Sequence, residues 1–305
     1  MIKLAIYWGG WAYFPFAVLC IWAILRAKPA VKVLASLALA LTSVVAYARF
    51  IEPRRLEVHR ETILLPGASE TSPSIAIALF AGPHIGMFGN AMPIRRIVQR
   101  INAEGVDAVF LAGDLTYHPG PEDIPEDFAA LSELGAPLYP VPGNHDIGFP
   151  GDDLSDALFA MLQDTGAVVV HNRAYETEIG GKPVIVSGAS DLWQRRQDFG
   201  FSSSLPADKP ILLLTHNPDT ALYVPDAFNY DLMLAGHTHG GQVRIPVLYK
   251  HVLPVRGPFD KELHRFETPA GERLVYVTTG TGLAGVPLRF LMPPRIDILT
   301  LHLPE

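Results

Sequence analysis

Histidine-rich polar clusters, each with glycines beside it, are the part of this sequence that could do chemistry. The candidate side chains offer imidazole, carboxylate and amide atoms, and they are His84, Asp114, Asn144, His216, His237 and His239. Nitrogen and oxygen donors without sulfur suit Zn, Mn, Fe or Ni and argue against a Ca site. A mononuclear centre needs about three protein ligands, so a set of this size predicts two ions, with the Asp114 carboxylate able to bridge them.

Two divalent ions about 3.5–4 Å apart form a clamp that polarises a phosphoryl group for in-line attack. The residue types therefore favour hydrolysis of a phosphoester bond. Glycines such as Gly113 and Gly236 let the backbone turn sharply beside the candidate ligands, and they let a substrate approach closely.

Elements of alternating type must bring these distant clusters together. Short β-rich runs are predicted at Ser74–Phe80, Ala108–Leu111, Leu138–Val141, Val168–His171, Val184–Ser187, Ile211–Thr215 and Leu232–Ala235, and helical patterns at Met92–Ala103, Ile124–Leu134 and Leu154–Asp164. This alternation indicates an α/β domain whose sheets are covered by helices. Nearly every polar cluster directly follows a strand, and ligands of open α/β sheets bind at the carboxyl ends of the strands.

The order and spacing of the clusters resemble the calcineurin-like metallophosphoesterase signature. The resemblance rests on Gly113-Asp114, Gly143-Asn144-His145-Asp146, His216 and Gly236-His237-Thr238-His239, and it covers roughly residues 74–303. The continuation Gly240-Gly241-Gln242 and the later Gly280-Thr281-Gly282 are similar to the membrane-associated bacterial branch of YaeI-like phosphodiesterases. The family fold, a β-sandwich flanked by helices, is accordingly expected for residues 74–305.

The resemblance also implies how the metal ligands divide. Asp114 would bridge two divalent ions, with Mn expected first and Zn, Fe or Ni as alternatives. One ion would be completed by Asn144, His216 and His237, and the other by His84 and His239.

Two further groups of residues would contact the substrate. By the same resemblance, His145 would lie beside the scissile phosphate as the catalytic residue. Asp146 would orient it, because a carboxylate on one imidazole nitrogen fixes the tautomer that the other nitrogen presents. Arg195, Arg196 and Arg244 are candidate phosphate-binding residues, since a guanidinium can pair bidentately with a phosphate.

One position departs from the family pattern. The family's first motif is Asp-x-His, whereas this chain has Gly82-Pro83-His84. Because glycine has no side-chain donor, the ion at this place loses an anionic ligand and should bind weakly. Three interpretations stay open: one tight ion beside a weak, water-rich one, an impaired variant of the enzyme, or another side chain such as Asn90 acting in place of the missing carboxylate.

The first fifty residues are strongly apolar. Leu4–Leu25 contains no charged residue and is long enough to cross roughly 30 Å of hydrocarbon as a helix. We expect a membrane hairpin over residues 1–50, with helices at about 4–25 and 31–48, and then a linker over residues 51–73. A single spanning helix with an interfacial one, or a soluble N-terminal region, are the alternatives. A cleaved signal peptide fits poorly, because its apolar region is usually about 7–15 residues long.

Charges around this hairpin predict its orientation. Five basic residues flank it on the side of the remaining chain and three at its turn, namely Lys3, Arg49, Arg54, Arg55 and Arg60 against Arg26, Lys28 and Lys32. The positive-inside rule then favours a cytoplasmic catalytic domain at a bacterial inner membrane. A net charge of −7 gives no support for nucleic-acid binding, which needs a basic face. The single cysteine, Cys20, excludes a disulfide framework within one chain.

A hydrolase held at a bilayer is expected to act on an amphipathic phosphoester. The specific expectation is hydrolysis of UDP-2,3-diacylglucosamine in lipid A assembly, an activity of membrane-associated relatives of this kind, and a phospholipid or another phosphodiester is the alternative. Two rival classes are a catalytically impaired metal- or phosphate-binding protein, which Gly82 favours and His145-Asp146 opposes, and a purely structural membrane module, which leaves the convergent polar residues unexplained.

Overall fold

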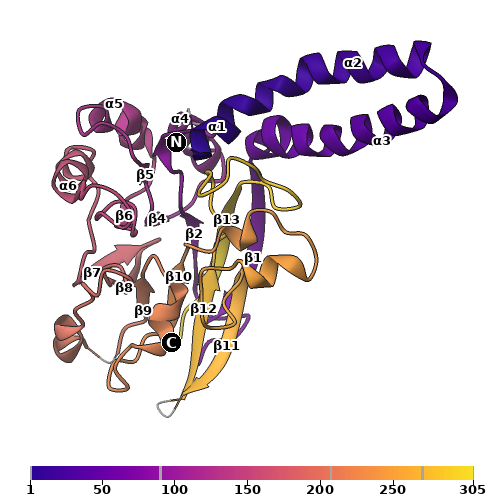
Figure 1. Cartoon of the computed structure of the whole chain (residues 1–305). Coiled ribbons are helices and arrows are strands. Elements are labelled where there is room, and N and C mark those ends of the chain that lie inside the picture. The colour runs from indigo at the N-terminus through magenta and orange to yellow at the C-terminus, as the bar shows by residue number, and fades with distance from the viewer. Residues whose placement is uncertain (1, 89–90, 207, 269–270, 305) are drawn as a thin grey trace.

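Two long N-terminal helices project side by side from the rest of the molecule in the computed structural model, which describes residues 2–88, 91–206, 208–268 and 271–304 (Figure 1). The first helix comprises α1 (Ile2–Gly9), a 3-10 turn (Gly10–Ala12) and α2 (Tyr13–Arg26). The second comprises α3 (Pro29–Ala46), a π-helical turn (Tyr47–Ile51) and a 3-10 turn (Glu52–Arg54). Pro29 suits the start of α3, because a helix does not use the N–H of its first residue.

Both helices are long and apolar enough to cross a membrane. They span Ile2–Arg26 and Pro29–Arg54, which are 25 and 26 residues. Their large apolar side chains point outward, as Trp22 at 61% exposure and Leu41 at 69% illustrate. A helix that is apolar on its exposed faces needs a non-aqueous partner, so these helices indicate association with a membrane.

The rest of the chain forms two large β-sheets. The first has the order β1-β13-β2-β4-β6 and the second β11-β12-β10-β9-β8-β7. The strands of the first are β1 (Glu57–Leu64), β13 (Arg295–His302), β2 (Ser74–Phe80), β4 (Ala108–Ala112) and β6 (Leu138–Val141). Those of the second are β11 (Glu262–Thr268), β12 (Gly271–Val277), β10 (Leu232–Ala235), β9 (Ile211–Leu214), β8 (Lys182–Gly188) and β7 (Arg173–Ile179). The pair β3 (Ile85–Gly86) and β5 (Thr116–Tyr117) is separate.

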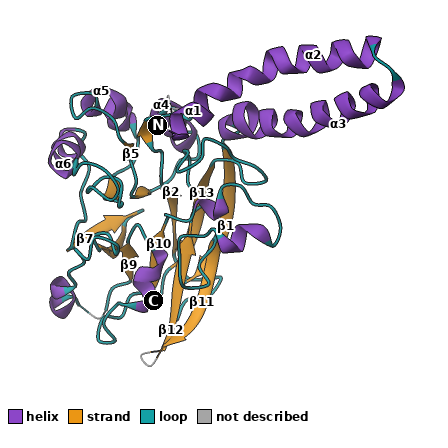
Figure 2. Ribbon diagram, in the orientation of Figure 1, coloured by secondary structure: helices purple, strands orange, loops and turns teal. Residues whose placement is uncertain are grey.

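Side chains from both sheets meet in one central core. Ile77 and Phe110 of the first sheet pack in the same buried cluster as Val186 and Leu234 of the second. On the outer face of the first sheet, α4 (Ile94–Asn102), α5 (Ile124–Phe128) and α6 (Ser155–Asp164) supply a second apolar cluster (Figure 2). The expected β-sandwich flanked by helices, with two apolar helices before it, is confirmed.

Two details of the predicted elements were wrong. The expected linker over residues 51–73 contains strand β1, which pairs along its whole length with β13, so this segment is part of the sheet. The run Val168–His171 is not a strand. Its backbone contacts the edge of β6 through two hydrogen bonds, from Val168 N–H to the Leu138 carbonyl and from Val170 N–H to the Pro140 carbonyl.

Candidate active site

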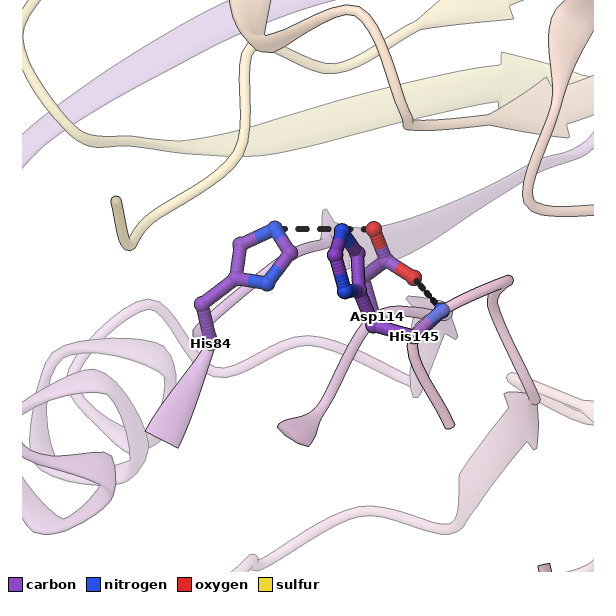
Figure 3. A group of neighbouring side chains, drawn as sticks. All are labelled: His84, Asp114 and His145. Carbon is purple, nitrogen blue, oxygen red and sulfur yellow. Dashed lines mark hydrogen bonds and ion pairs between the residues drawn. The ribbon is translucent and has the colours of Figure 1, made fainter. Parts of the chain in front are cut away.

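The candidate ligands converge because each follows the carboxyl end of a strand. Asp114 comes two residues after β4, Asn144 and His145 come after β6, His216 after β9, and His237 and His239 after β10. The strands β4 and β6 belong to the first sheet, and β9 and β10 belong to the second. The site therefore lies where the carboxyl ends of strands from both sheets come together. Figure 3 shows His84 and the backbone N–H of His145 directed at the two oxygens of Asp114.

The backbone around these side chains adopts unusual angles. His84, Asp114, His237 and His239 have φ values of 49°, 55°, 68° and 50°. Residues other than glycine rarely occupy this left-handed region, and such strain concentrates at functional sites. Gly113 permits the turn into Asp114, since a Cβ at its φ of 75° would lie 2.7 Å from the backbone nitrogen of Gly143.

Asp114, His216 and His237 form the better-built half of the site. Asp114 Oδ2 lies 3.1 Å from His216 Nε2, which lies 3.0 Å from His237 Nδ1. His216 Nδ1 donates to the Ala112 carbonyl at 2.8 Å, and His237 Nε2 to the Pro254 carbonyl at 3.3 Å. With these two nitrogens directed outward, the other ring nitrogens face inward, His216 Nε2 toward Asp114 and His237 Nδ1 toward His216. Without metal, a proton on His216 Nε2 can occupy this position, and a divalent ion that binds here would displace it.

Asn144 is the candidate fourth ligand, expected from the sequence to bind the same ion as Asp114, His216 and His237. Its amide nitrogen donates to the Phe149 carbonyl, which leaves Oδ1 as the free end of the side chain. This Oδ1 atom is buried and has no hydrogen-bond partner. A buried acceptor without a partner is costly unless an ion satisfies it. The set of two imidazoles, one carboxylate and one amide oxygen therefore fits a divalent metal ion.

Charges in this half prepare it for a cation. Burial alone would lower the pKa of His216, but the Asp114 carboxylate raises it to about 9, so a metal ion that binds this ring must displace its proton. Burial lowers the pKa of His237 to about 3, so that ring is neutral near pH 7. Burial opposes ionisation of Asp114, yet His216 and the other imidazoles hold the pKa of that carboxyl well below its usual range. The carboxylate is thus anionic and ready to bind metal.

The other half, around Gly82, fits a second tightly held ion poorly. His239 Nδ1 lies 3.1 Å from Nη2 of Arg289, a fully buried guanidinium. A guanidinium can only donate, so the proton of His239 is on Nε2, the atom 2.9 Å from His84 Nε2. That nitrogen then has no lone pair for a metal. Burial lowers the pKa of Arg289 only to about 9, so its positive charge is present at neutral pH and would repel a second cation.

Gly82 itself leaves no open space for a carboxylate. Its φ is 52°, and a Cβ there would lie 2.9 Å from His239 Nε2 and 3.3 Å from His84 Cδ2. The two imidazoles therefore occupy the volume into which a side chain at position 82 would extend. The alternative ligand Asn90 lies outside the described residues.

The structure corrects the expectation for Asp146. Its oxygens accept hydrogen bonds from Leu115 N, Thr116 N, Thr116 Oγ1 and Gly143 N, at 2.8–3.1 Å. Both oxygens are thus occupied, and none of these contacts involves His145. The carboxylate faces the turns that carry Asp114 and Asn144. Asp146 therefore holds those turns together and does not orient the His145 ring.

His145 lies at the edge of the cluster with its ring free to act. Its Nδ1 atom is buried without a hydrogen-bond partner, and its ring lies 4.8 Å from that of Tyr117 and 5.1 Å from that of His84. Burial lowers the pKa of His145, and Asp114 opposes this shift, while nearby cations including Lys3 lower it further. The imidazole is therefore poised as a neutral group beside the Asp114 carboxylate.

The three candidate arginines differ in their surroundings. Arg196 pairs with Asp153 at 2.9 Å on the surface, and Arg195 is exposed. Arg244 is held by Asp260 at 2.6 Å and by the Gly240 carbonyl, so it supports the His239 loop. A role in substrate binding stays a prediction for all three.

Sequence reasoning missed several neighbours of the site. Arg289 and Tyr117 are fully buried beside the histidines, and Trp193 lies with its ring 4.4 Å from that of His237. Tyr117 follows Asp114 closely in sequence and could have been flagged by that spacing. No sequence signal connects Arg289 with His239, fifty residues away.

Comparison with known proteins gives a consistent result. The family profile described as calcineurin-like phosphoesterase matches residues 75–241. The uncharacterised metallophosphoesterase YkuE of Bacillus subtilis is 30% identical over 84% of this chain and 88% of its own length. The phosphodiesterase YaeI of Escherichia coli is 30% identical over 86% of this chain and 94% of its own. A transmembrane protein with a metallophosphoesterase domain from Danio rerio is 26% identical over 87% of this chain and 62% of its own.

Proposed function

Because this chain belongs to the calcineurin-like phosphoesterase family, we propose that it hydrolyses a phosphoester at a membrane surface, using one tightly held divalent ion. One observation carries the proposal. Asp114, His216 and His237 bring their ligand atoms within 4.8 Å of one another, and the buried Oδ1 atom of Asn144, in the loop after β6, has no hydrogen-bond partner. The two apolar N-terminal helices support the membrane location.

The chain's own residues divide the chemistry. A divalent ion in this site supplies Lewis-acid polarisation of the phosphoryl group. Asp114 Oδ1 accepts the backbone N–H of His145 at 3.0 Å, which fixes the start of the loop that carries the imidazole. The neutral His145 ring can donate a hydrogen bond to the phosphoryl oxygen, and only its protonated imidazolium form can give a proton to the leaving oxygen. General acid catalysis of this kind contributes about 10²–10⁴-fold.

Turnover of bis(p-nitrophenyl) phosphate with Mn²⁺, Zn²⁺, Fe²⁺ or Ni²⁺ by the full-length protein in detergent tests this function. The wild type should release p-nitrophenol, with Mn²⁺ expected to support the fastest rate. His145→Ala should lower kcat by about 100-fold or more. Its tightly retained metal should not change, because the His145 ring belongs to the other possible metal-ligand group, with His84 and Asp114, and not to the group of Asp114, His216 and His237. Equal rates for the two proteins would remove the catalytic claim.

The number of ions is a separate measurement. We expect close to one tightly retained ion per chain after dialysis, measured by elemental analysis. Gly82→Asp supplies the missing carboxylate but must displace the His239 ring, since a Cβ at this position lies 2.9 Å from it. If the wild type retains two ions, or if Gly82→Asp changes neither metal content nor rate, the deficit assigned to Gly82 is wrong.

For the substrate we propose UDP-2,3-diacylglucosamine, with a phospholipid or another phosphodiester as the alternative. The support is the combination of a phosphoester-hydrolysing family with helices suited to a bilayer. Incubation of the protein with this lipid and Mn²⁺, followed by analysis for UMP, decides between them. If a preparation that cleaves bis(p-nitrophenyl) phosphate releases no UMP, UDP-2,3-diacylglucosamine is not the substrate, while the general phosphoesterase activity stands.

The buried Arg289 beside His239 favours a second candidate function, a binding protein that retains phosphate or metal without turnover. In that case the protein would bind Mn²⁺ and inorganic phosphate in a titration and show no release of p-nitrophenol. The free Nδ1 atom of His145 argues against it, since a binding protein does not need an unpartnered imidazole beside the donor set.

A further inference from the structure

The first turn of the N-terminal helix lies against the active site. Lys3 Nζ donates a hydrogen bond to Tyr117 Oη at 2.6 Å, across 114 positions of sequence. Tyr117 belongs to β5, three residues after Asp114, and Figure 1 shows the N-terminus beside this strand. The Lys3 ammonium also lies 5.2 Å from the centre of the Tyr117 ring. A membrane helix thus places a cation next to the loop that carries a metal ligand.

Aromatic packing holds this helix turn in place. Tyr7 stacks on Phe88 with ring centres 5.6 Å apart, and Phe88 packs on Tyr117 at 5.3 Å. Tyr117 in turn lies 4.8 Å from the His145 ring and 5.3 Å from the His84 ring. Arg49 of the second helix covers the other side of Tyr7, with its guanidinium 3.9 Å from the ring centre. The position of Lys3 relative to His145 is therefore fixed by a continuous set of contacts.

The second helix is also joined to the loops of the site. The Ala48 carbonyl accepts the backbone N–H of Arg289 at 2.9 Å, and Glu52 accepts that of Met292 at 2.6 Å. Arg289 is the residue that reaches His239. The base of the hairpin consequently lies directly over the active site. If the hairpin is in a bilayer, the site is at the bilayer surface.

Lys3 has the properties of a phosphate-binding residue. Its side chain is exposed, and its described polar contact is with the Tyr117 hydroxyl, not with a carboxylate. That hydroxyl also accepts the Gly285 backbone N–H at 3.3 Å, so it holds the ammonium without neutralising it. An ammonium is a compact point charge that suits a phosphate oxygen. At a helix end beside the membrane surface it can reach the headgroup level of a lipid.

We propose that Lys3 is a substrate-positioning residue that binds a non-bridging phosphate oxygen of a membrane lipid, so that the substrate is a lipid phosphoester whose apolar part stays in the bilayer along the hairpin. This inference rests on the proposed hydrolase function and adds to it the residue that selects a lipid. Lys3 acts on binding, because the reacting groups are Asp114, His145 and the donor set around them. Free phosphate and a lipid headgroup share the same charge chemistry, so the test must distinguish them.

Binding measurements on the Mn²⁺-loaded, full-length protein in detergent test the inference independently of turnover. The probes are dioctanoyl phosphatidic acid and glycerol 3-phosphate, which carry the same phosphate with and without acyl chains. We expect the lipid to bind wild type at least about ten-fold more tightly than glycerol 3-phosphate. Lys3→Gln should weaken lipid binding by about ten-fold and Lys3→Arg should restore most of it, since arginine retains the charge. Lys28→Gln, at the far end of the hairpin, is the matched control.

Three results would overturn the inference. The first is equal lipid affinity in Lys3→Gln and Lys28→Gln, and the second is equal affinity of wild type for the two probes. The third is loss of bound Mn²⁺ in Lys3→Gln, which would show that the substitution acts through the metal site. Where bis(p-nitrophenyl) phosphate is turned over, Lys3→Gln should in addition raise the KM of a lipid substrate more than it lowers kcat. If the protein binds lipid through Lys3 but turns over no substrate, the proposed hydrolase function is wrong and the lipid-binding role of Lys3 stands.

Discussion

At the scale of single residues, Asp146 shows that a residue within a catalytic motif can act by holding the backbone of neighbouring turns in place. It follows His145 in sequence, but its carboxylate accepts hydrogen bonds from the turns after β4 and β6. Burial and the neighbouring Asp114 together raise the pKa of Asp146 to about 6, although the hydrogen bonds from Gly143 and Thr116 oppose this shift. Asp146 therefore fixes the positions of the two turns on which Asp114 and Asn144 lie.

Asp146→Ala should mainly destabilise the fold. It leaves buried N–H and O–H donors of three residues without an acceptor, and we expect the free energy of unfolding to fall by about 3 kcal/mol or more. Urea denaturation of the full-length protein in detergent measures this. Asp226→Ala removes an exposed carboxylate and should change stability by less than about 0.5 kcal/mol. If Asp146→Ala had wild-type stability and greatly reduced turnover, we would conclude that Asp146 orients the His145 ring after all.

Metal retention separates the two halves of the site. Asn144→Ala removes a donor whose oxygen has no other partner, so the affinity for Mn²⁺ should fall by more than about ten-fold. His239→Gln keeps an N–H where His239 has one and should change this affinity by less than about two-fold. Competition with a chelator, followed by elemental analysis, gives both values. Greater metal loss in His239→Gln than in Asn144→Ala would show that the ion lies on the Gly82 side.

At the scale of elements, the strands after residue 241 complete the fold although the family match ends there. Strand β13 lies between the edge strand β1 and the central strand β2 of the first sheet. Its Leu299 and Leu301 are fully buried in the central core with Tyr276 of β12. Without these strands, both sheets would expose apolar faces and unpaired edges.

A chain truncated after residue 241 should therefore not fold. We expect limited proteolysis to digest its catalytic portion completely, whereas the full-length protein leaves a resistant fragment. As a control, two residues inserted at the Gly180-Gly181 turn between β7 and β8 should be tolerated, because that turn lies at a sheet edge. A protected core in the truncated chain would show that β11–β13 are dispensable.

The sequence predicted the strands that carry ligands more accurately than the others. Ser74–Phe80, Leu138–Val141 and Leu232–Ala235 match β2, β6 and β10, because short apolar runs bounded by glycine and polar residues mark buried strands clearly. Strand β1 was missed since most of its residues Glu57–Leu64 are polar, without regular alternation, and most are only partly buried or exposed, as befits an edge strand. Its partner is almost 240 positions away, and no local pattern reports such a pairing.

The sequence predicted which residues form the site, but it did not predict the positive charges of Arg289 and Lys3 beside them. The clusters at Asp114, Asn144, His216 and His237 carry a spacing that indicates metal binding, and the structure brings them together. The contacts of Arg289 and Lys3 arise from packing between segments far apart in the chain, so no local sequence pattern indicates their effect on the site.

At the scale of the whole molecule, the hairpin sets where the catalytic portion must lie. We propose that this portion is cytoplasmic at a bacterial inner membrane, on the flanking-charge argument above. In a Cys20→Ser background, Ala27→Cys at the hairpin turn should then react with an impermeant thiol reagent in intact cells. Ser203→Cys, exposed on the catalytic portion, should react only after permeabilisation. The reverse pattern would invert the topology.

The pairing of β1 with β13 has a consequence for how the protein is made. The ribosome produces the membrane hairpin and β1 early, whereas β13, which must insert between β1 and β2, is among the last segments synthesised. Until then, β1 and β2 have no shared neighbour, and the first sheet stays open between them. Pairings of such high sequence separation form slowly. The nascent chain should therefore wait at the membrane with an unfinished sheet, and a chaperone that shields strand edges would be needed most at this stage.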